Sequence, residues 1–287
     1  MAGSSSAFRK HGTFVYEVDE TVHDYGDNAK AIAAMKNAEM THAWVRIHNA
    51  TPYGSAKKKI IKQFIDDLKA AGIAVAGWGW CQGEDSSADA KMAADEVSHF
   101  QLTDYIADIE NGVHDCEWTA SEVENFCKKV RPKIAGSFGI TTFPLIDWHE
   151  PELMKAALPY VDMFNPQVYW LRFPRKDMVK EFKRPNGQPY KLNNAAEYAD
   201  LCIDRWDTLM GGTPKDLVIT GEAYWGEGKP PMTQLEAEDK LDEFLAAWNG
   251  FNRVIGLNWW HFGGSKAMKN RMLTSITNAH LGSKPYK

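Results

Sequence analysis

Eight short runs of β-forming residues alternate with segments of helical periodicity from one end of the 287-residue chain to the other. The expected strands are GTFVYEVD (12–19), THAWVRIHN (41–49), IAVAGWGW (73–80), DYIADIE (104–110), KIAGSFGITTF (133–143), VDMFNPQVYW (161–170), DLVITGEAYW (216–225) and RVIGLNWWHF (253–262). A helical pattern follows these runs, as in AKKKIIKQFIDDLKAAG (56–72), whose last glycine suits a helix C-terminus. Eight β–α pairs in succession are typical of a parallel barrel. We therefore predict an α/β protein with a single (β/α)8 TIM barrel.

The length of the chain agrees with one such barrel, which typically uses about 250 residues. We expect the barrel to span 11–280, with residues 1–10 and 281–287 loose at the ends. An open doubly wound sheet is the main alternative, but no Gly-rich phosphate loop follows the first run. Residues 171–194 form a basic insertion after the sixth strand, on the side where barrel enzymes bind substrate. This insertion is either a solvated loop or a wall or lid of the cleft.

Composition narrows the classes of function. A net charge of −5 and a pI near 6.0 argue against a nucleic-acid-binding protein, which would usually present a basic face. The four cysteines show no CxxC spacing, so we expect free thiols rather than a zinc site or a disulfide framework. No window approaches the roughly 20 apolar residues of a membrane span. The opening MAGSSSAFRKHG lacks the apolar core of a signal peptide, so we expect cytoplasmic synthesis.

Two carboxylates, Asp108 and Glu110, end the fourth expected strand, directly before Gly112 turns the chain. Because alternate residues of a strand share a face, both side chains should point the same way. The C-terminal ends of barrel strands are where barrel enzymes carry their catalytic groups. A purely structural role explains two such acids poorly, because acids inside a barrel are costly to ionise. We predict that Asp108 and Glu110 form a catalytic pair.

Polar and aromatic side chains converge on the same mouth from most of the other strands. The alternation selects as candidate substrate-binding residues Glu17, Asp19, Arg46, Trp78, Trp80, Gln167, Tyr169, Glu222, Trp259 and Trp260. Flat aromatic faces suit sugar binding, and the chain carries eleven tryptophans. Glu17, Asp19 and Arg46 could instead form a structural ion-pair network inside the barrel. Of the adjacent Trp259 and Trp260, we expect one to pack in the core and the other to face a sugar.

Two carboxylates at the floor of an aromatic cleft suit the cleavage of a glycosidic bond. Glu110 lies at the strand tip, nearer the mouth, and we expect it to protonate the leaving oxygen. Asp108, one pleat deeper, would raise the pKa of Glu110. Asp108 would also stabilise the oxocarbenium-like centre, attack it, or orient a water molecule or the substrate's own amide.

Short stretches of the chain resemble two families of barrel glycosidases. ADIE (107–110) looks like the Asp-x-Glu at the end of the fourth strand in family-25 lysozymes and in family-18 chitinases. VYEVDE (15–20) is similar to the acid-bearing first strand of the lysozymes, with Glu17 where that family usually has Asp. The tryptophans of GLNWWHF (256–262) resemble the eighth-strand aromatic of both families. MFNPQVYW (163–170) looks more like the sixth strand of the chitinases, where a tyrosine helps to hold an N-acetyl group.

The chain also departs from both families. The longer Asp-rich signature of the chitinases is absent, since Asp104 alone precedes ADIE, and no eighth-strand Asp of the lysozyme kind is present. The choice between a protein nucleophile and amide-assisted cleavage therefore stays open. Both families act on β-1,4-linked N-acetylated aminosugars, so the resemblance implies peptidoglycan or a chitin-like glycan as substrate.

The expected lack of a signal peptide favours a peptidoglycan muramidase of the phage-endolysin type, or a secretion-system effector, that reaches the cell wall through another system. The alternatives are a chitinase- or glucosaminidase-like hydrolase and a glycan-binding barrel without activity, which would typically have lost the acid at Glu110. The basic side chains of the insertion could bind an anionic wall polymer. They are Arg172, Arg175, Lys176, Lys180, Lys183 and Arg184.

A metal-dependent hydrolase would need several His or carboxylate ligands at the strand ends. His48 and His261 supply no obvious set of ligands, and we expect both to be hydrogen-bonded rather than catalytic; His48 should share the inward face of the second strand with Arg46. We therefore expect no metal and no cofactor. The expected partner is a glycan substrate, without nucleic acid or membrane, and the expected state is a monomer.

Overall fold

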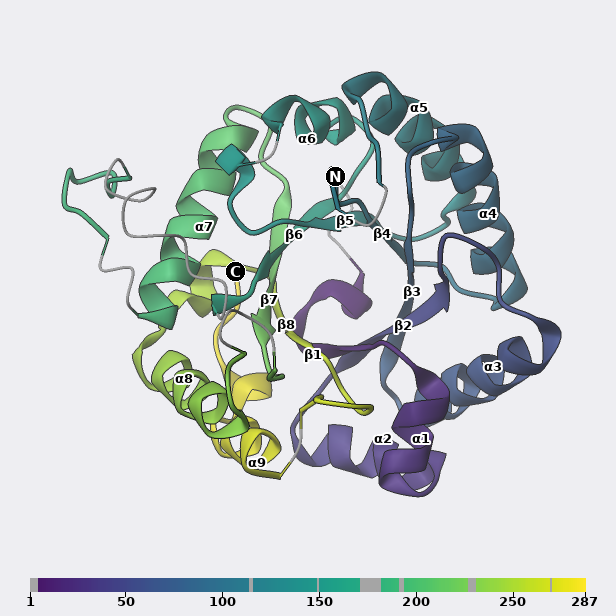
Figure 1. The fold of residues 1–287 in the computed structure, drawn as a ribbon, viewed down its shortest axis with the longest axis horizontal. Coiled ribbons are helices and arrows are strands. Elements are labelled where there is room, and N and C mark those ends of the chain that lie inside the picture. The colour runs from purple at the N-terminus through teal and green to yellow at the C-terminus, as the bar shows by residue number, and fades with distance from the viewer. Residues whose placement is uncertain are drawn as a thin grey trace.

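The computed structural model describes residues 5–113, 116–148, 150–170, 182–190, 194–226, 231–268 and 270–287. Within these residues eight parallel strands close into a barrel in chain order (Figure 1). They are β1 (Lys10–Val15), β2 (His42–His48), β3 (Ala74–Trp80), β4 (Tyr105–Asp108), β5 (Phe138–Thr142), β6 (Met163–Val168), β7 (Asp216–Glu222) and β8 (Gly256–Trp260). The last strand pairs with the first, with Thr13 opposite Trp259, so the barrel sheet has no open edge. The predicted (β/α)8 barrel is confirmed.

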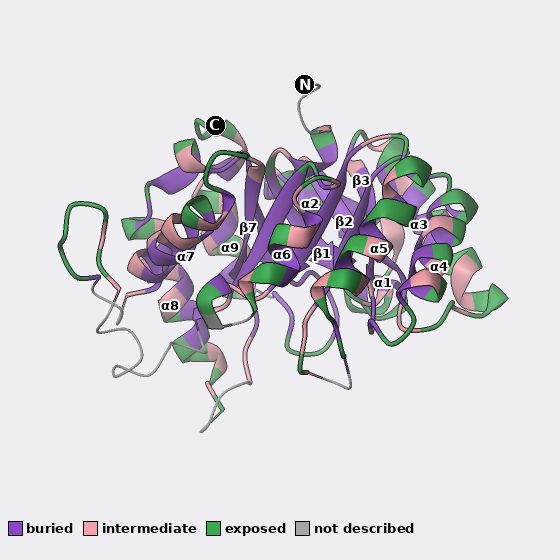
Figure 2. Ribbon diagram, turned by 90° about the horizontal axis from the view of Figure 1, so that it is seen from above, coloured by how far each residue is buried: buried purple, intermediate pink, exposed green. Residues whose placement is uncertain are grey.

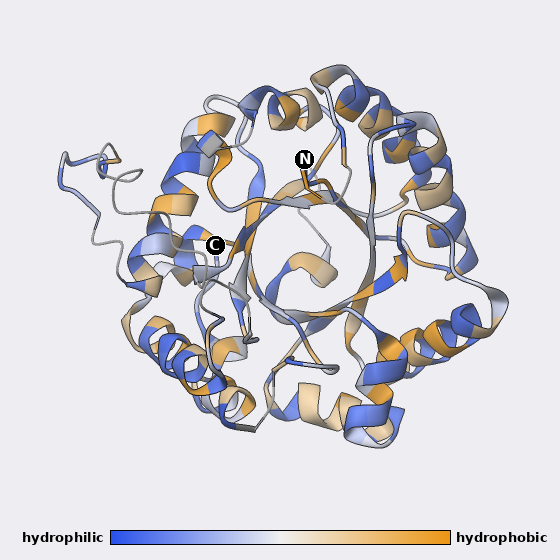
Figure 3. Ribbon diagram, in the orientation of Figure 1, coloured by the Kyte–Doolittle hydropathy of each residue, from blue (hydrophilic) through white to orange (hydrophobic). Residues whose placement is uncertain are grey.

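Helices surround the barrel on its outer side. They are α1 (Val18–Tyr25), α2 (Asn28–Asn37), α3 (Ser55–Ala70), α4 (Ser86–His99), α5 (Ala120–Val130), α6 (Pro151–Ala157), α7 (Ala195–Met210), α8 (Gln234–Ala247) and α9 (Asn270–Asn278). Figure 2 shows buried strands at the centre and helices whose outer faces are exposed. Figure 3 shows the same division, with hydrophobic and hydrophilic stretches alternating along the helices. This amphipathic pattern places the apolar stripe of each helix against the sheet.

The first strand is shorter than the sequence analysis predicted. The chain leaves the sheet after Val15, and α1 begins at Val18. Glu17 is the N-cap residue of this helix and Asp19 lies in its first turn, where acidic side chains are favoured by the helix dipole. The prediction that Glu17 and Asp19 belong to the first strand is therefore wrong. Val18 and Val22, four residues apart, carry the helical signal that the analysis missed.

The two termini are packed against the barrel where the structure describes them. The short turn η1 (Ser6–Phe8) closes the N-terminal end of the barrel, with Phe8 fully buried and Trp44 Nε1 donating to the Ala7 carbonyl at 2.7 Å. At the other terminus Leu281 is buried, and the Lys287 N–H donates to the Val254 carbonyl at 3.0 Å. The prediction of loose ends is thus wrong for residues 5–10 and 281–287. With this end closed, the C-terminal ends of the strands form the mouth.

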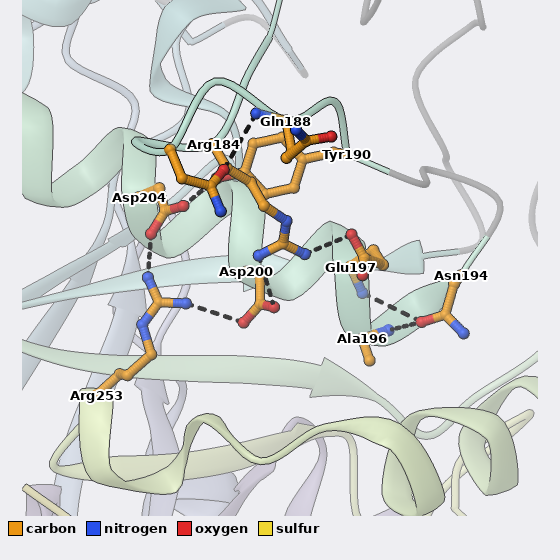
Figure 4. Close-up of polar contacts among 10 residues, drawn as sticks. Arg184, Gln188, Tyr190, Asn194, Ala196, Glu197, Asp200, Asp204 and Arg253 are labelled. Atoms are coloured by element: carbon orange, nitrogen blue, oxygen red, sulfur yellow. Dashed lines mark hydrogen bonds and ion pairs between the residues drawn. The ribbon is translucent and has the colours of Figure 1, made fainter.

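Residues 182–190 of the insertion are held against α7 (Figure 4). Arg184 forms an ion pair with Glu197 and approaches Asp200 to 3.5 Å, and its guanidinium lies 4.6 Å from the ring centroid of Tyr190. The Tyr190 hydroxyl donates a hydrogen bond to Asp204, further along α7. These contacts give the segment a fixed attachment to the outer wall of the barrel.

The same contacts bear on the expected polymer-binding surface. The charge of Arg184 is matched by carboxylates of its own chain, so this residue does not offer a free charge to an anionic polymer. Lys183 is exposed. Four of the basic residues of that prediction, Arg172, Arg175, Lys176 and Lys180, lie outside the described residues.

All four cysteines are buried free thiols, as expected. Across the part of the chain that the structure describes, no helix combines the length and apolar character that a membrane span requires.

Candidate active site

A cavity of about 670 Å³ lies at the C-terminal end of the barrel. Asp108 and Glu110 reach it from the end of β4. The candidate substrate-binding residues that line it are Arg46, Trp78, Trp80, Gln167, Tyr169 and Trp260. These side chains come from four other strands and meet at one mouth, as the alternation rule predicts.

The end of β4 determines how the two carboxylates point. The Ile109 N–H donates to the Thr141 carbonyl at 3.0 Å, so the extended pairing continues one residue past Asp108. Ile109 is fully buried among the residues between sheet and helices, whereas Asp108 and Glu110 face the cavity. Gly112 then turns the chain with a φ of 78°, a left-handed conformation that favours glycine.

The two carboxyl groups are in hydrogen-bond contact. Burial raises the pKa of Asp108 well above its usual range, and the negative charge of Glu110 and this hydrogen bond raise it further. The Gln167 amide and the Arg46 charge act in the opposite direction. Burial and the neighbouring charge therefore favour a pair that shares one proton over two ionised carboxylates.

The structure supports a raised pKa at Asp108, whereas the sequence analysis expected one at Glu110. Asp108 is 8% exposed, while Glu110 is only partly buried. The desolvation penalty falls on the deeper group, so the pKa of Asp108 is the one that burial raises.

Aromatic rings form one wall of the cavity. Trp260 packs edge-on against Trp78 at 5.6 Å and against Tyr16 at 5.3 Å between ring centroids. Tyr169 lies 5.7 Å from Tyr224 in a T-shaped contact and 6.4 Å from Trp260. Trp260 is partly exposed, so an apolar face remains available to a ligand.

Trp259 does not reach the cavity. It is fully buried on the outer side of β8, where Nε1 donates to His11 Nε2 at 2.7 Å and the ring packs against Trp170 and Phe244. Adjacent residues of a strand point to opposite faces, so Trp259 faces the helices and Trp260 the cavity. The expectation of one core and one cavity tryptophan is confirmed, and the assignment of Trp259 as a substrate-binding residue is wrong.

Arg46 is the member of the expected ion-pair network that reaches the cavity. Its guanidinium is buried, pairs with Glu17, and lies 3.9 Å from the ring centroid of Tyr16. Glu17 also pairs with Lys57, whose Nζ lies 3.9 Å from Asp19 Oδ1. Glu17 and Asp19 are not among the cavity-lining residues, and the Asp19 side chain is 54% exposed. The network alternative therefore describes Glu17 and Asp19 better than substrate binding does.

Two histidines near the mouth are neutral. The register of β2 shifts between Arg46 and His48, and this irregularity turns His48 away from the cavity. The prediction that His48 shares the inward face of β2 with Arg46 is therefore wrong. His48 Nε2 lies 2.8 Å from the Tyr105 hydroxyl, and burial lowers the pKa of His48 to about 4. His261 does line the cavity, and burial likewise lowers the pKa of His261 to about 4.

Glu222, at the end of β7, is 2% exposed and lies outside the cavity lining. Its charge acts on the neighbouring Tyr169 and Tyr198. The structure therefore places it behind the cavity wall rather than among the groups a substrate would touch first.

The cavity also contains residues that the sequence analysis did not assign to it. Tyr16 follows β1, and Trp225 ended the expected seventh strand, so the strand rule reached both positions without assigning them. Tyr198 comes from α7 and Lys266 from the loop after β8. A rule based on strand alternation cannot find these two.

Among the described residues, no group of three or more His, Cys, Asp or Glu side chains is placed to hold a metal ion. The chemistry that the described side chains offer is proton transfer by a carboxyl pair inside an aromatic cavity.

The fold and the site together define a (β/α)8 barrel with a hydrogen-bonded carboxyl pair in its mouth. No family model matches the chain, and no curated protein matches its sequence. Among solved structures, the catalytic domain of a hyperthermophilic chitinase from Pyrococcus furiosus matches with a TM-score of 0.65 and 10% identity, over 96% of this chain and 95% of that one.

Two further matches are of the same kind. A GH18 chitinase from the chitin utilization locus of Flavobacterium johnsoniae gives a TM-score of 0.61 at 10% identity, over 96% of this chain and 94% of that one. A class V chitinase from Pseudomonas fluorescens Pf-5 gives 0.60 at 10% identity, over 94% and 99%. At this level of identity the likeness establishes the fold alone.

Proposed function

We propose that the protein is a glycoside hydrolase that cleaves β-linked glycans of N-acetylated aminosugars, with chitin-like glycans as its first candidate substrates. The observation that carries this proposal is the hydrogen-bonded pair of Asp108 and Glu110 inside an aromatic cavity. The likeness to chitinase catalytic domains supports the chitin-like substrate. None of the three structures named above is a lysozyme, so the muramidase specificity stays a prediction.

The contact between the two carboxyl groups restricts the mechanism. Inverting glycosidases hold their carboxyl groups about 6.5–9.5 Å apart, and retaining enzymes with a protein nucleophile hold them about 5–5.5 Å apart. Asp108 and Glu110 are closer than either arrangement because they share a hydrogen bond. We therefore assign Asp108 a role other than nucleophile or base for a water molecule. The proposed nucleophile is the carbonyl oxygen of the substrate's own 2-acetamido group.

In this mechanism the proton of the pair moves from Asp108 to Glu110 and then to the glycosidic oxygen. An acetamido N–H that donates to Asp108 stabilises this residue as a carboxylate, and the proton passes to Glu110. Glu110 gives it to the glycosidic oxygen while the bond from this oxygen to C1 breaks and the acetamido oxygen bonds to C1. The resulting oxazolinium cation lies beside the negative Asp108. Water opens this ion, Glu110 accepts the water's proton, and C1 keeps its original configuration.

Tyr169 and the tryptophans supply the binding surface for such a substrate. Burial raises the pKa of Tyr169 well above its usual range, so its hydroxyl stays protonated and can donate to the acetamido carbonyl. The partly exposed face of Trp260 is available to a pyranose ring.

The substrate panel that tests this proposal contains chitin oligosaccharides, their fully deacetylated counterparts and purified peptidoglycan strands. We expect cleavage of the acetylated oligosaccharide, with a β-anomer as the first product by NMR. The deacetylated form should resist cleavage because it lacks the nucleophile. An α-anomer, or equal rates on both oligosaccharides, would contradict the mechanism. Cleavage of peptidoglycan strands alone would favour the muramidase, and binding without cleavage would favour the inactive barrel.

A further inference from the structure

A chain of hydrogen bonds inside the barrel connects a backbone carbonyl to the catalytic pair. Asn165 Nδ2 donates to the Val218 carbonyl at 2.7 Å. Asn165 Oδ1 accepts from the Thr141 hydroxyl at 2.8 Å. Gln167 Nε2 donates to Thr141 Oγ1 at 3.4 Å and to Asp108 Oδ1 at 3.2 Å. Every side chain of this series is buried, so these groups are satisfied by one another.

The direction of each hydrogen bond in this chain is determined by its starting point. The Val218 carbonyl can only accept, so Asn165 must turn its NH2 group toward it and its oxygen toward Thr141. The Thr141 hydroxyl has a single hydrogen. It points this hydrogen at Asn165, whose side-chain and backbone oxygens both accept from it.

Only lone pairs of Thr141 Oγ1 then remain for Gln167. Gln167 must therefore present its NH2 group rather than its carbonyl oxygen, and the same NH2 group reaches Asp108 Oδ1. The polarity set at Val218 is in this way transmitted to the carboxyl group of Asp108.

We propose that Thr141 and Asn165 are positioning residues that fix the orientation of the Gln167 amide and thereby confine a proton on Asp108 to Oδ2, the oxygen that this amide does not contact. Asp108 Oδ1 is held as an acceptor, so the proton belongs on Oδ2. The catalytic consequence rests on the proposed function, whereas the placement of the proton does not.

The alternative orientation shows why this matters. A reversed Gln167 would turn its carbonyl oxygen to Asp108 and accept the proton that the leaving group needs. The position one pleat below Asp108 on the inward face is Ile106, which is fully buried and apolar. No carboxyl group of β4 therefore lies beneath Asp108 to hold its proton. The side chains that orient this proton come from the neighbouring strands β5 and β6.

The direct test is difference infrared spectroscopy of the protonated Asp108 carbonyl in the full chain, with the band identified by its loss in Asp108→Asn. Thr141→Val removes the hydroxyl that holds Gln167, so the band should move to higher frequency as Oδ1 loses its donor. Gln167→Met should give the same shift, which keeps the test decisive if Thr141→Val folds poorly. Thr141→Ser retains the hydroxyl and should leave the band in place.

Thr220→Val is the matched control. The Thr220 hydroxyl donates to the same Asn165 oxygen at 2.8 Å but makes no hydrogen bond to Gln167. This variant loses an equivalent buried hydroxyl and should leave the Asp108 band unchanged. An unchanged band in Thr141→Val and Gln167→Met, or an equal shift in Thr220→Val, would overturn the proposal.

Kinetics on a chitin oligosaccharide add a second readout. Thr141→Val should lower kcat about ten-fold and change the pH profile of kcat, while Thr141→Ser and Thr220→Val keep the wild-type profile. If no glycan is cleaved by the wild type, the proposed function fails, and the infrared result still decides the proton placement.

Discussion

Replacing Asp108 by asparagine should make the protein more stable at alkaline pH while it removes the proton of the pair. Burial, followed by the charge of Glu110, raises the pKa of Asp108 above the value of 3.8 that an unfolded chain gives it. Between these two values the folded wild type holds one proton more than the unfolded chain. Its stability therefore falls as the pH rises through this window, by at most about 1.4 kcal/mol per pH unit.

The asparagine side chain of the variant cannot ionise, so this loss disappears. Its carbonyl oxygen can accept from Gln167 and its NH2 group can donate to Glu110, so no buried polar group is left without a partner. The difference in unfolding free energy between Asp108→Asn and the wild type should therefore grow with pH, with the slope of one proton at most.

Urea unfolding at a series of pH values from about 4 to 9 measures this difference. A substitution of the same type at an exposed carboxylate, Glu84→Gln, controls for the general effect of removing a carboxylate. A difference that stays constant over the whole range, or that decreases with pH, would refute the assignment of the buried proton to Asp108.

Three further predictions concern the surroundings of the pair. Trp259→Ala should cost about 3–5 kcal/mol of unfolding free energy because it empties a buried site, whereas Trp260→Ala should raise KM about ten-fold; urea unfolding and steady-state kinetics separate the two. His261→Gln should leave the pH profile of kcat/KM unchanged near neutrality, because burial lowers the pKa of His261 to about 4 and the ring is neutral above it; loss of a limb would contradict this. Arg184→Gln should speed proteolysis of residues 182–190 while changing the unfolding free energy by about 1 kcal/mol or less, since its partner Glu197 is partly exposed; equal cleavage rates would count against the attachment.

The barrel was predictable because its signal is local and repeated. Each β–α pair is marked by a change from period-two to helical periodicity in the sequence. Eight such changes in succession are compatible with few folds. That the Asp108 and Glu110 side chains point to the same face of the sheet was predictable for the same reason. Alternation along a strand determines the face to which each side chain points. The same rule placed Trp78 and Gln167 correctly in the cavity.

The residues that were predicted in the wrong place lie where the alternation of side chains along a strand ends or shifts. Glu17 and Asp19 left the strand because a helix begins at Val18, and His48 turned outward because the register of β2 shifts before it. Tyr198 entered the cavity from a helix that is distant in sequence. These outcomes are set by the packing of the whole barrel rather than by the neighbouring residues.

The raised pKa of Asp108 also depends on the packing of the whole barrel. Sequence spacing shows that Asp108 and Glu110 share a face, but the depth of each carboxyl group decides which pKa burial raises. The hydrogen bonds from Thr141 through Gln167 likewise join strands that only the closed barrel brings together.

The most direct measurement of the central claim is the rate of chitin-oligosaccharide cleavage by the wild type and by Glu110→Gln, compared at equal folded concentration and with substrate binding measured in parallel. We predict that the variant keeps its fold and its affinity and loses about 10²–10⁴-fold in kcat, because it has no proton to give the leaving oxygen. A Glu110→Gln variant that cleaves the oligosaccharide as fast as the wild type would contradict the role of Glu110 as the proton donor.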